Sequence, residues 1–175
     1  MRTQQSGFTM IEVLVTIGIL VVGLLGLAAL QTLTQVAELE SYQRSQAIVL
    51  VRDMADRIAG NKANMGQYLG NDVGLAEVDC TGKTGAALDL CEWGNQLKGA
   101  AEKSGGNAVG AMIGARGCVV KIDGQSVLVT VAWQGLSNTG APKEACGQGA
   151  YGAGALDGQR RTVSTIVKAA YLAGT

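Results

Sequence analysis

The feature that most constrains this chain is a long apolar stretch near its N-terminus that contains a single acidic residue. Glu12 is the only charged residue between Arg2 and Glu38. Within this stretch, the segment Met10 to Leu30 has the roughly 20 residues that a helix needs to cross the hydrocarbon core of a bilayer. A carboxylate inside such a helix costs about 3 kcal/mol on insertion scales, so Glu12 indicates a functional group that needs a partner.

The polar head before this stretch predicts the orientation of the chain in a membrane. Met1 to Gly7 carries Arg2 and the α-amino group as its only charges. Positively charged flanks of a membrane helix stay on the cytoplasmic side. We therefore expect the head in the cytoplasm, a single inner-membrane span, and a periplasmic location for the residues after Leu30.

The junction between head and helix resembles the class III signal of type IV pilins and of the pseudopilins of type II secretion. The matching residues are Gly7-Phe8-Thr9-Met10-Ile11-Glu12-Val13-Leu14-Val15. The resemblance implies that prepilin peptidase cleaves after Gly7 and N-methylates the new first residue, Phe8. It also implies that Glu12 guides subunit assembly. Residues 1–7 are then a leader peptide that the mature protein lacks.

Two simpler interpretations compete for the same segment. An ordinary secretory signal has an apolar core of about 7 to 15 residues, followed by small residues at its cleavage site. The apolar core here is longer, and Ala28-Ala29 is a weak cleavage site. A plain single-pass anchor accounts for the length of the helix but not for Glu12 or for the Gly7-Phe8 junction.

The chemistry of Glu12 supports an assembly role independently of the resemblance. Cleavage after Gly7 leaves a cationic amine on Phe8, one helical turn before Glu12. Buried charges persist when they are paired and hydrogen-bonded. When parallel helices pack with an axial stagger, the amine of one subunit neutralises Glu12 of the next, so Glu12 is expected to set the register. The alternative is a carboxylate that contacts water near the membrane face or is paired within its own chain.

The composition leaves room for one modest globular domain beyond the helix. The chain has 175 residues, 14 basic and 14 acidic side chains, and no histidine. This balance predicts no nucleic-acid partner, because the basic footprint that binds phosphates is missing. Without histidine the usual general base near neutral pH is absent. No Gly-x-Ser-x-Gly elbow, Gly-x4-Gly-Lys loop or histidine-based triad occurs, so we expect neither an enzyme nor a cofactor.

Four cysteines follow the apolar helix, namely Cys80, Cys91, Cys118 and Cys146. An even number in an oxidising compartment indicates disulfides, for which three pairings exist. We favour Cys80–Cys91 with Cys118–Cys146, because pairing neighbours in sequence closes one small and one larger loop. A zinc site is the alternative, but no Cys-x-x-Cys spacing and no histidine supports it, so no metal is expected.

The helix is expected to continue beyond the membrane. Apolar residues recur at steps of three and four after Leu27, which is the pattern of one buried helical stripe. They are Leu30, Leu33, Ala37, Ala47, Leu50, Val51, Met54, Ala55 and Ile58. Gly60-Asn61 provides a stop signal. We therefore predict one helix from Phe8 to Ala59, in which 8–30 spans the membrane and 31–60 is the amphipathic half with its stop.

Residues 61–175 are expected to form a periplasmic head with a small antiparallel sheet. A hairpin is predicted where Cys118–Ile122 and Gln125–Trp133 flank the dipeptide Asp123-Gly124, which suits a two-residue type I′ turn. A third strand is expected at Arg161–Tyr171. The apolar face of this sheet should pack on the helix stripe, because neither element can bury its face alone.

The segment 61–117 shows little clean periodicity. It is rich in glycine and predicts a loop-rich connector with one short helix near Ala86–Leu97. Together these elements define the expected fold class, which is α+β and pilin-like, with a long N-terminal helix packed on a small antiparallel sheet.

Three further segments resemble the minor pilins of the PilV type, the pilus-modification proteins of type IV pilus systems. They are Arg52–Ile58 with Asn61, Val129–Gly135 and Arg160–Val163. A helix end, a core strand and an edge strand would account for their spacing equally well. The resemblance implies a low-abundance subunit that primes fibre assembly at or near the tip and supports adhesion and twitching motility.

The resemblance also implies a set of partners and a route through the cell envelope. The partners are other minor pilins, the major pilin, prepilin peptidase, the inner-membrane assembly platform and a tip adhesin. The protein is expected to move from the inner membrane into the extracellular pilus fibre. A minor pseudopilin of a type II secretion system shares the same signal and is the alternative function.

Overall fold

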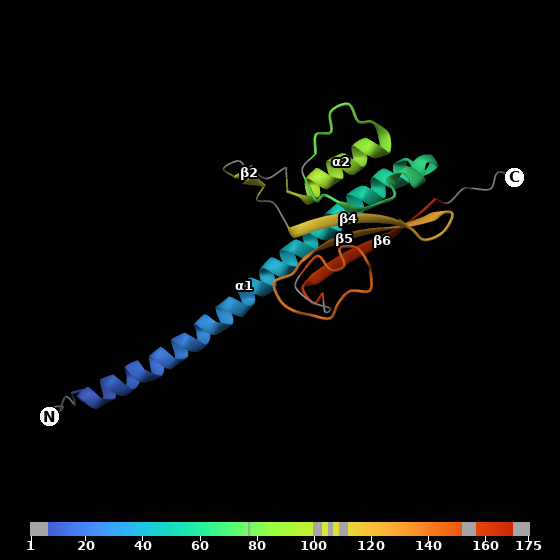
Figure 1. Ribbon diagram of the computed structural model, residues 1–175. Coiled ribbons are helices and arrows are strands. Elements are labelled where there is room, and N and C mark those ends of the chain that lie inside the picture. Colours follow the sequence, from blue (N-terminus) through green and yellow to red (C-terminus); the bar gives the residue numbers. More distant parts are fainter. Residues whose placement is uncertain are drawn as a thin grey trace, which may run out of the picture. The chain divides into compact units, whose positions relative to one another are not determined.

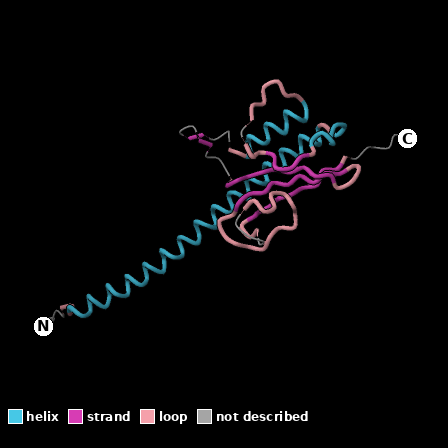
Figure 2. The backbone as a smooth tube through the Cα atoms, viewed as in Figure 1, coloured by secondary structure: helices cyan, strands magenta, loops and turns pink. Residues whose placement is uncertain are grey.

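The computed structural model describes residues 7–76, 78–99, 103–104, 107–108, 112–151 and 157–169. The contacts divide the chain into two units, Met1–Leu39 and Glu40–Thr175. Residues 1–6 of the expected leader and residues 170–171 of the expected third strand lie outside the described residues. Figure 1 colours the elements in chain order, and Figure 2 distinguishes helices from strands.

The first unit is formed by the N-terminal part of helix α1 (Met10–Gly60), which continues into the second unit. The helix begins after Thr9, whose carbonyl oxygen accepts the N–H groups of Glu12 and Val13 at 3.1 and 3.3 Å. The structure thus confirms the predicted long helix. Its first residue comes two positions after Phe8, because these two hydrogen bonds close the first turn at Thr9.

The core of the second unit lies between the C-terminal part of α1 and a four-stranded sheet. Along this part α1 buries one residue in every three or four: Gln43, Ala47, Val51, Met54 and Ile58. The apolar members share one cluster with alternate residues of strand β5 (Ser126–Gln134), namely Val127, Val129 and Val131. The structure therefore confirms that the apolar face of the sheet packs on the helix stripe.

The sheet consists of β1 (Gly70–Val73), β4 (Ile113–Lys121), β5 and β6 (Arg160–Lys168), in the order β1-β4-β5-β6. All neighbouring strands are antiparallel, and Figure 2 shows them side by side. The register places Val129 between Val119 and Thr165. The fold class is α+β with a pilin-like arrangement, as predicted, and β1 is a strand that the sequence pattern does not reveal.

The loop between β4 and β5 differs from the predicted two-residue turn. The backbone N–H of Ile122 donates to the carbonyl oxygen of Ser126 at 3.0 Å, which leaves three residues in the loop. A type I′ turn needs a positive φ at both central residues, and neither Asp123 nor Gly124 has one. The prediction is wrong because the Asp123 carboxylate accepts the N–H of Gln125 at 2.7 Å and stabilises the wider loop.

The segment between α1 and β4 has more structure than the predicted connector. It contains the 3₁₀ helix η1 (Lys62–Tyr68), β1, helix α2 (Gly85–Leu97), and a pair formed by β2 (Lys103–Ser104) and β3 (Asn107–Ala108). The predicted short helix Ala86–Leu97 is confirmed, since α2 begins one residue earlier and ends at the same residue.

Trp93 of α2 contacts both α1 and the sheet. Its side chain is fully buried, and its indole Nε1 donates to the carbonyl oxygen of Leu50 at 2.9 Å. The six-membered ring lies against Gly117 of β4, where an added Cβ would be 2.1 Å from the ring carbon Cη2. Position 117 therefore requires glycine because the indole occupies the space that a side chain would need.

Replacing Gly117 with alanine should destabilise the second unit. A methyl group at this position forces the Trp93 ring or β4 to move, and overpacking of this kind costs about 1 to 3 kcal/mol. Chemical denaturation measures the difference in unfolding free energy between variant and wild type. Gly124→Ala is the matched control, because no atom lies within 4 Å of its added Cβ. Equal stability of Gly117→Ala and wild type would contradict this packing.

Candidate functional site

The start of α1 presents the residues that the sequence predicts for processing and assembly. Gly7 and Phe8 precede the helix, and Glu12 lies in its first turn. All three are exposed, and 82% of Phe8 is accessible. The ion pairs among the described residues all lie in the second unit, so none of them involves Glu12.

The apolar side chains that follow Glu12 are also exposed. Every residue from Gly7 to Gln35 is accessible, including Ile11, Leu14 and Leu25. In the described part of the chain α1 is long and apolar enough to cross a membrane, and no residue of its apolar window is buried. Soluble monomers rarely expose a contiguous apolar surface of this extent, so the surface indicates contact with lipid or with other helices.

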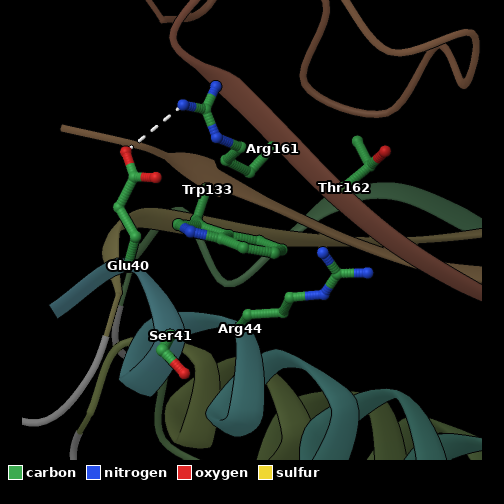
Figure 3. Close-up of a pocket in the computed structure, with 6 residues that line it drawn as sticks. All are labelled: Glu40, Ser41, Arg44, Trp133, Arg161 and Thr162. Carbon is green, nitrogen blue, oxygen red and sulfur yellow. Dashed lines mark hydrogen bonds and ion pairs between the residues drawn. The ribbon is translucent and has the colours of Figure 1, made fainter. Parts of the chain in front are cut away.

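Glu40 attaches the loop after β5 to α1. Its Oε1 atom accepts the N–H of Leu136 at 3.1 Å, and the N–H and hydroxyl of Ser137 at 3.0 and 2.7 Å. Arg161 of β6 approaches the same oxygen at 3.3 Å, and Figure 3 shows the two side chains pointing toward one another. The Ser137 hydroxyl is the main cause that lowers the pKa of Glu40, and the charge of Arg161 adds to it.

A buried arginine, Arg160, also binds the loop that follows β5 and connects it to β6. Its side chain is almost fully buried. The guanidinium donates to the carbonyl oxygens of Pro142 at 3.1 Å, Cys146 at 3.0 Å, and Glu144. An ion pair with Asp157 neutralises its charge. Because a guanidinium carries five donors in a fixed fork, one side chain satisfies several carbonyl groups of the loop at once.

Two disulfides close loops in the second unit. Cys80 is bonded to Cys91, and Cys118 is bonded to Cys146, which are the pairs favoured from their order in the sequence. The first joins the segment before α2 to the middle of that helix. The second joins β4 to the loop that Arg160 holds, in a small core of its own.

Arg57 joins α1 to α2 near the C-terminal end of α1. Its guanidinium contacts carboxylates of Asp53 at 3.0 Å, Asp89 at 3.1 Å and Glu92 at 2.7 Å. The hydroxyl of Tyr68 also donates to Asp89. Burial first, and then this hydrogen bond, raises the pKa of Tyr68. Among the described residues no group of acidic, histidine and cysteine side chains is arranged to hold a metal ion.

Sequence reasoning singled out the start of α1 and the cysteines, but it missed the arginine clusters of the head. Glu40 and Arg161 are 121 positions apart, and no spacing rule links residues at that distance. Arg57, Arg160 and Arg161 do lie in the segments that resemble minor pilins. That resemblance is the one signal that could have drawn attention to them.

Comparison with known families identifies the N-terminal part of the chain. Residues 2–28 match the model of the prokaryotic N-terminal methylation motif. Residues 29–91 match the model described as type IV pilin Tt1218. The two matches adjoin and together extend from the head before α1 into α2. No curated protein and no solved structure matches the chain.

Replacing Glu40 with alanine should destabilise the second unit, because the donors of Leu136, Ser137 and Arg161 lose their acceptor. Hydrogen bonds to a charged group contribute about 1.5 to 3 kcal/mol. Since the pKa of Glu40 is lowered in the folded state, this contribution is complete above the ordinary pKa and disappears as the pH falls through the lowered one. Denaturation curves of variant and wild type should therefore differ at neutral pH and converge in strong acid.

The matched control for this experiment is Glu38→Ala, an exposed acidic residue on the same helix. Its unfolding free energy should stay within about 0.5 kcal/mol of wild type at every pH. A Glu40→Ala difference that is absent at neutral pH, or that persists undiminished in acid, would contradict the role of the carboxylate.

Removing the Cys118–Cys146 disulfide should cost more stability than removing Cys80–Cys91. The sequence separations are 28 and 11 residues, for which the chain-entropy relation gives about 3.5 and about 3 kcal/mol. A serine hydroxyl is placed at two buried positions in the 118/146 variant and at one, position 91, in the 80/91 variant, so the desolvation cost is also larger for 118/146. Thermal denaturation of the two double serine variants tests this order, and a larger loss from the 80/91 variant would refute it.

Proposed function

We propose that the chain is a type IV pilin, as the matches over residues 2–28 and 29–91 support, and that it is a minor pilin that primes assembly of a type IV pilus and is incorporated at or near the tip. Type IV pilins are structural subunits rather than enzymes. Their N-terminal methylation motif and apolar helix associate them with a membrane and with assembly partners, and both features are present here.

The observation that carries the proposal is the exposed start of α1, where a processing junction is followed by a single carboxylate. Prepilin peptidase cleaves after Gly7 and methylates Phe8, which leaves a cationic amine at the new N-terminus. Glu12 is then the one acidic group in the apolar stretch that precedes Glu38. An unpaired charge in such surroundings is costly, whereas a paired and hydrogen-bonded one is tolerated.

This cost gives Glu12 its role in assembly. In a bundle of parallel helices, the amine of one subunit meets Glu12 of its neighbour at one axial stagger only. Any other stagger leaves both charges in apolar surroundings, and breaking such a buried pair costs about 3 to 5 kcal/mol. The charge match therefore selects the register in which a subunit enters the fibre.

The minor role within the pilus is supported by the segments that resemble PilV-type minor pilins. Two of these segments, Val129–Gly135 and Arg160–Val163, are paired in the sheet through β5 and β6. On this proposal the protein rests in the inner membrane with a periplasmic head, and joins other minor pilins and the major pilin at the assembly platform. It supports a tip adhesin, pilus-dependent adhesion and twitching motility.

Substitution of Glu12 tests the proposal directly. Glu12→Ala should be processed normally, with a mature mass that begins at methylated Phe8, yet its recovery in sheared fibres should fall at least about tenfold because the charge pair is lost. Glu38→Ala, an exposed acidic residue outside the apolar stretch, is the matched control and should enter fibres like wild type. Normal recovery of Glu12→Ala would refute the register role.

Two companion strains complete this experiment. Gly7→Ala should retain the seven-residue leader, and a mature-length protein from this variant would contradict cleavage at Gly7. A strain that lacks the chain should lose surface pili and twitching. Accumulation of unsecreted exoproteins with normal pili would instead identify a minor pseudopilin of type II secretion.

A further inference from the structure

A pocket of about 370 Å³ lies within the second unit, between α1 and the strands β5 and β6. Its lining residues are Glu40, Ser41 and Arg44 from α1, Trp133 from β5, and Arg161 and Thr162 from β6. Trp133 and Arg161 are register partners in the sheet, so the pairing of β5 with β6 fixes the relative positions of these two lining residues. Figure 3 shows the six side chains around this space.

The pocket contains one more arginine than its carboxylate neutralises. The Glu40 carboxylate already forms an ion pair with Arg161 and accepts hydrogen bonds from the loop after β5. Glu40 and Arg44 are four residues apart, a spacing that favours an ion pair on a helix. In Figure 3, however, the Arg44 side chain extends away from the Glu40 carboxylate. The ion pairs of the described residues use Arg57, Arg116, Arg160 and Arg161, and not Arg44.

The lining of the pocket favours a carboxylate as its ligand. A guanidinium recognises a carboxylate through two parallel N–H···O hydrogen bonds, which are stronger than neutral ones. The Thr162 hydroxyl already donates to Glu144 at 3.0 Å, and Figure 3 shows the Ser41 hydroxyl pointing away from Trp133 and Arg161, so Arg44 is the donor that remains. Trp133 lines the pocket, but only 3% of this residue is accessible. Its ring therefore has no exposed face on which a carbohydrate ligand could stack. The volume is at the lower end of the range for ligand pockets and suits a side chain.

We propose that Arg44 binds an aspartate or glutamate side chain of a neighbouring pilin subunit in this pocket. The inference rests on the proposed function, which packs α1 of successive subunits in one fibre. A neighbouring subunit is then the protein held at high effective concentration beside α1. Charge complementarity favours the acidic side chains of that subunit, because the Arg44 guanidinium is the charged group of the pocket that takes part in no ion pair among the described residues.

Arg52 provides a matched control on the same helix. It is exposed, it takes part in none of the ion pairs among the described residues, and it does not line this pocket. Arg44 and Arg52 therefore carry the same charge at similar exposure, and they differ in the presence of the pocket. Variants at both positions should melt at the wild-type temperature, since neither side chain is buried.

The first test measures binding with purified full-length protein in detergent. The probe is acetyl-Gly-Glu-Glu-Gly-amide, and acetyl-Gly-Gln-Gln-Gly-amide is its uncharged counterpart. Isothermal titration should detect the glutamate peptide alone, with an affinity that Arg44→Ala lowers about tenfold or more and that Arg52→Ala leaves unchanged. Failure of wild type to bind the glutamate peptide, equal binding of both peptides, or an equal loss from both alanine variants would overturn the proposal.

The second test measures recovery in sheared fibres, where Arg44→Glu should fall about tenfold and Arg52→Glu should not. This experiment separates the inference from the function on which it rests. If wild type is present in fibres and Glu12→Ala is lost from them, an undiminished Arg44→Glu overturns the pocket proposal alone. If wild type itself is missing from fibres of a piliated strain, the proposed function fails.

Discussion

The packing of one side of α1 against the valines of β5 is the contact on which the rest of the second unit depends. Val51, Met54, Val129 and Val131 are all buried in it. The polar clusters are arranged around this core. Glu40 with Arg161 joins α1 to the far edge of the sheet, and Arg57 joins α1 to α2. Each cluster joins elements that the core also holds together.

Helix α1 changes character along its length, and this change divides the protein into two units. Up to Gln35 its residues are all exposed although most are apolar, whereas from Gln43 to Ile58 one side is buried by the head. An apolar surface without cover is unfavourable in water, so the first unit calls for lipid or other helices. One element thus combines an exposed apolar half with a half that forms part of the core.

Local sequence patterns predict this fold well wherever periodicity is strong. They identify α1 and the strands around Val119, Val129 and Val163, and the short helix α2. They fail at β1, a four-residue strand in which Asp72 adopts a positive φ and the register is interrupted. They also fail at the Asp123 loop, where a side-chain hydrogen bond decides the conformation. The arginine clusters escape prediction because their members meet only after the chain has folded.

The hydrogen bonds from Arg160 to the connection between β5 and β6 affect which substitutions this connection tolerates. Its guanidinium contacts the backbone carbonyl groups of Pro142, Glu144 and Cys146, not their side chains. Substitutions in the intervening residues therefore leave the anchor intact, provided that Cys146 keeps its disulfide. A loop that is held through its backbone in this way can change its side chains and still keep its path.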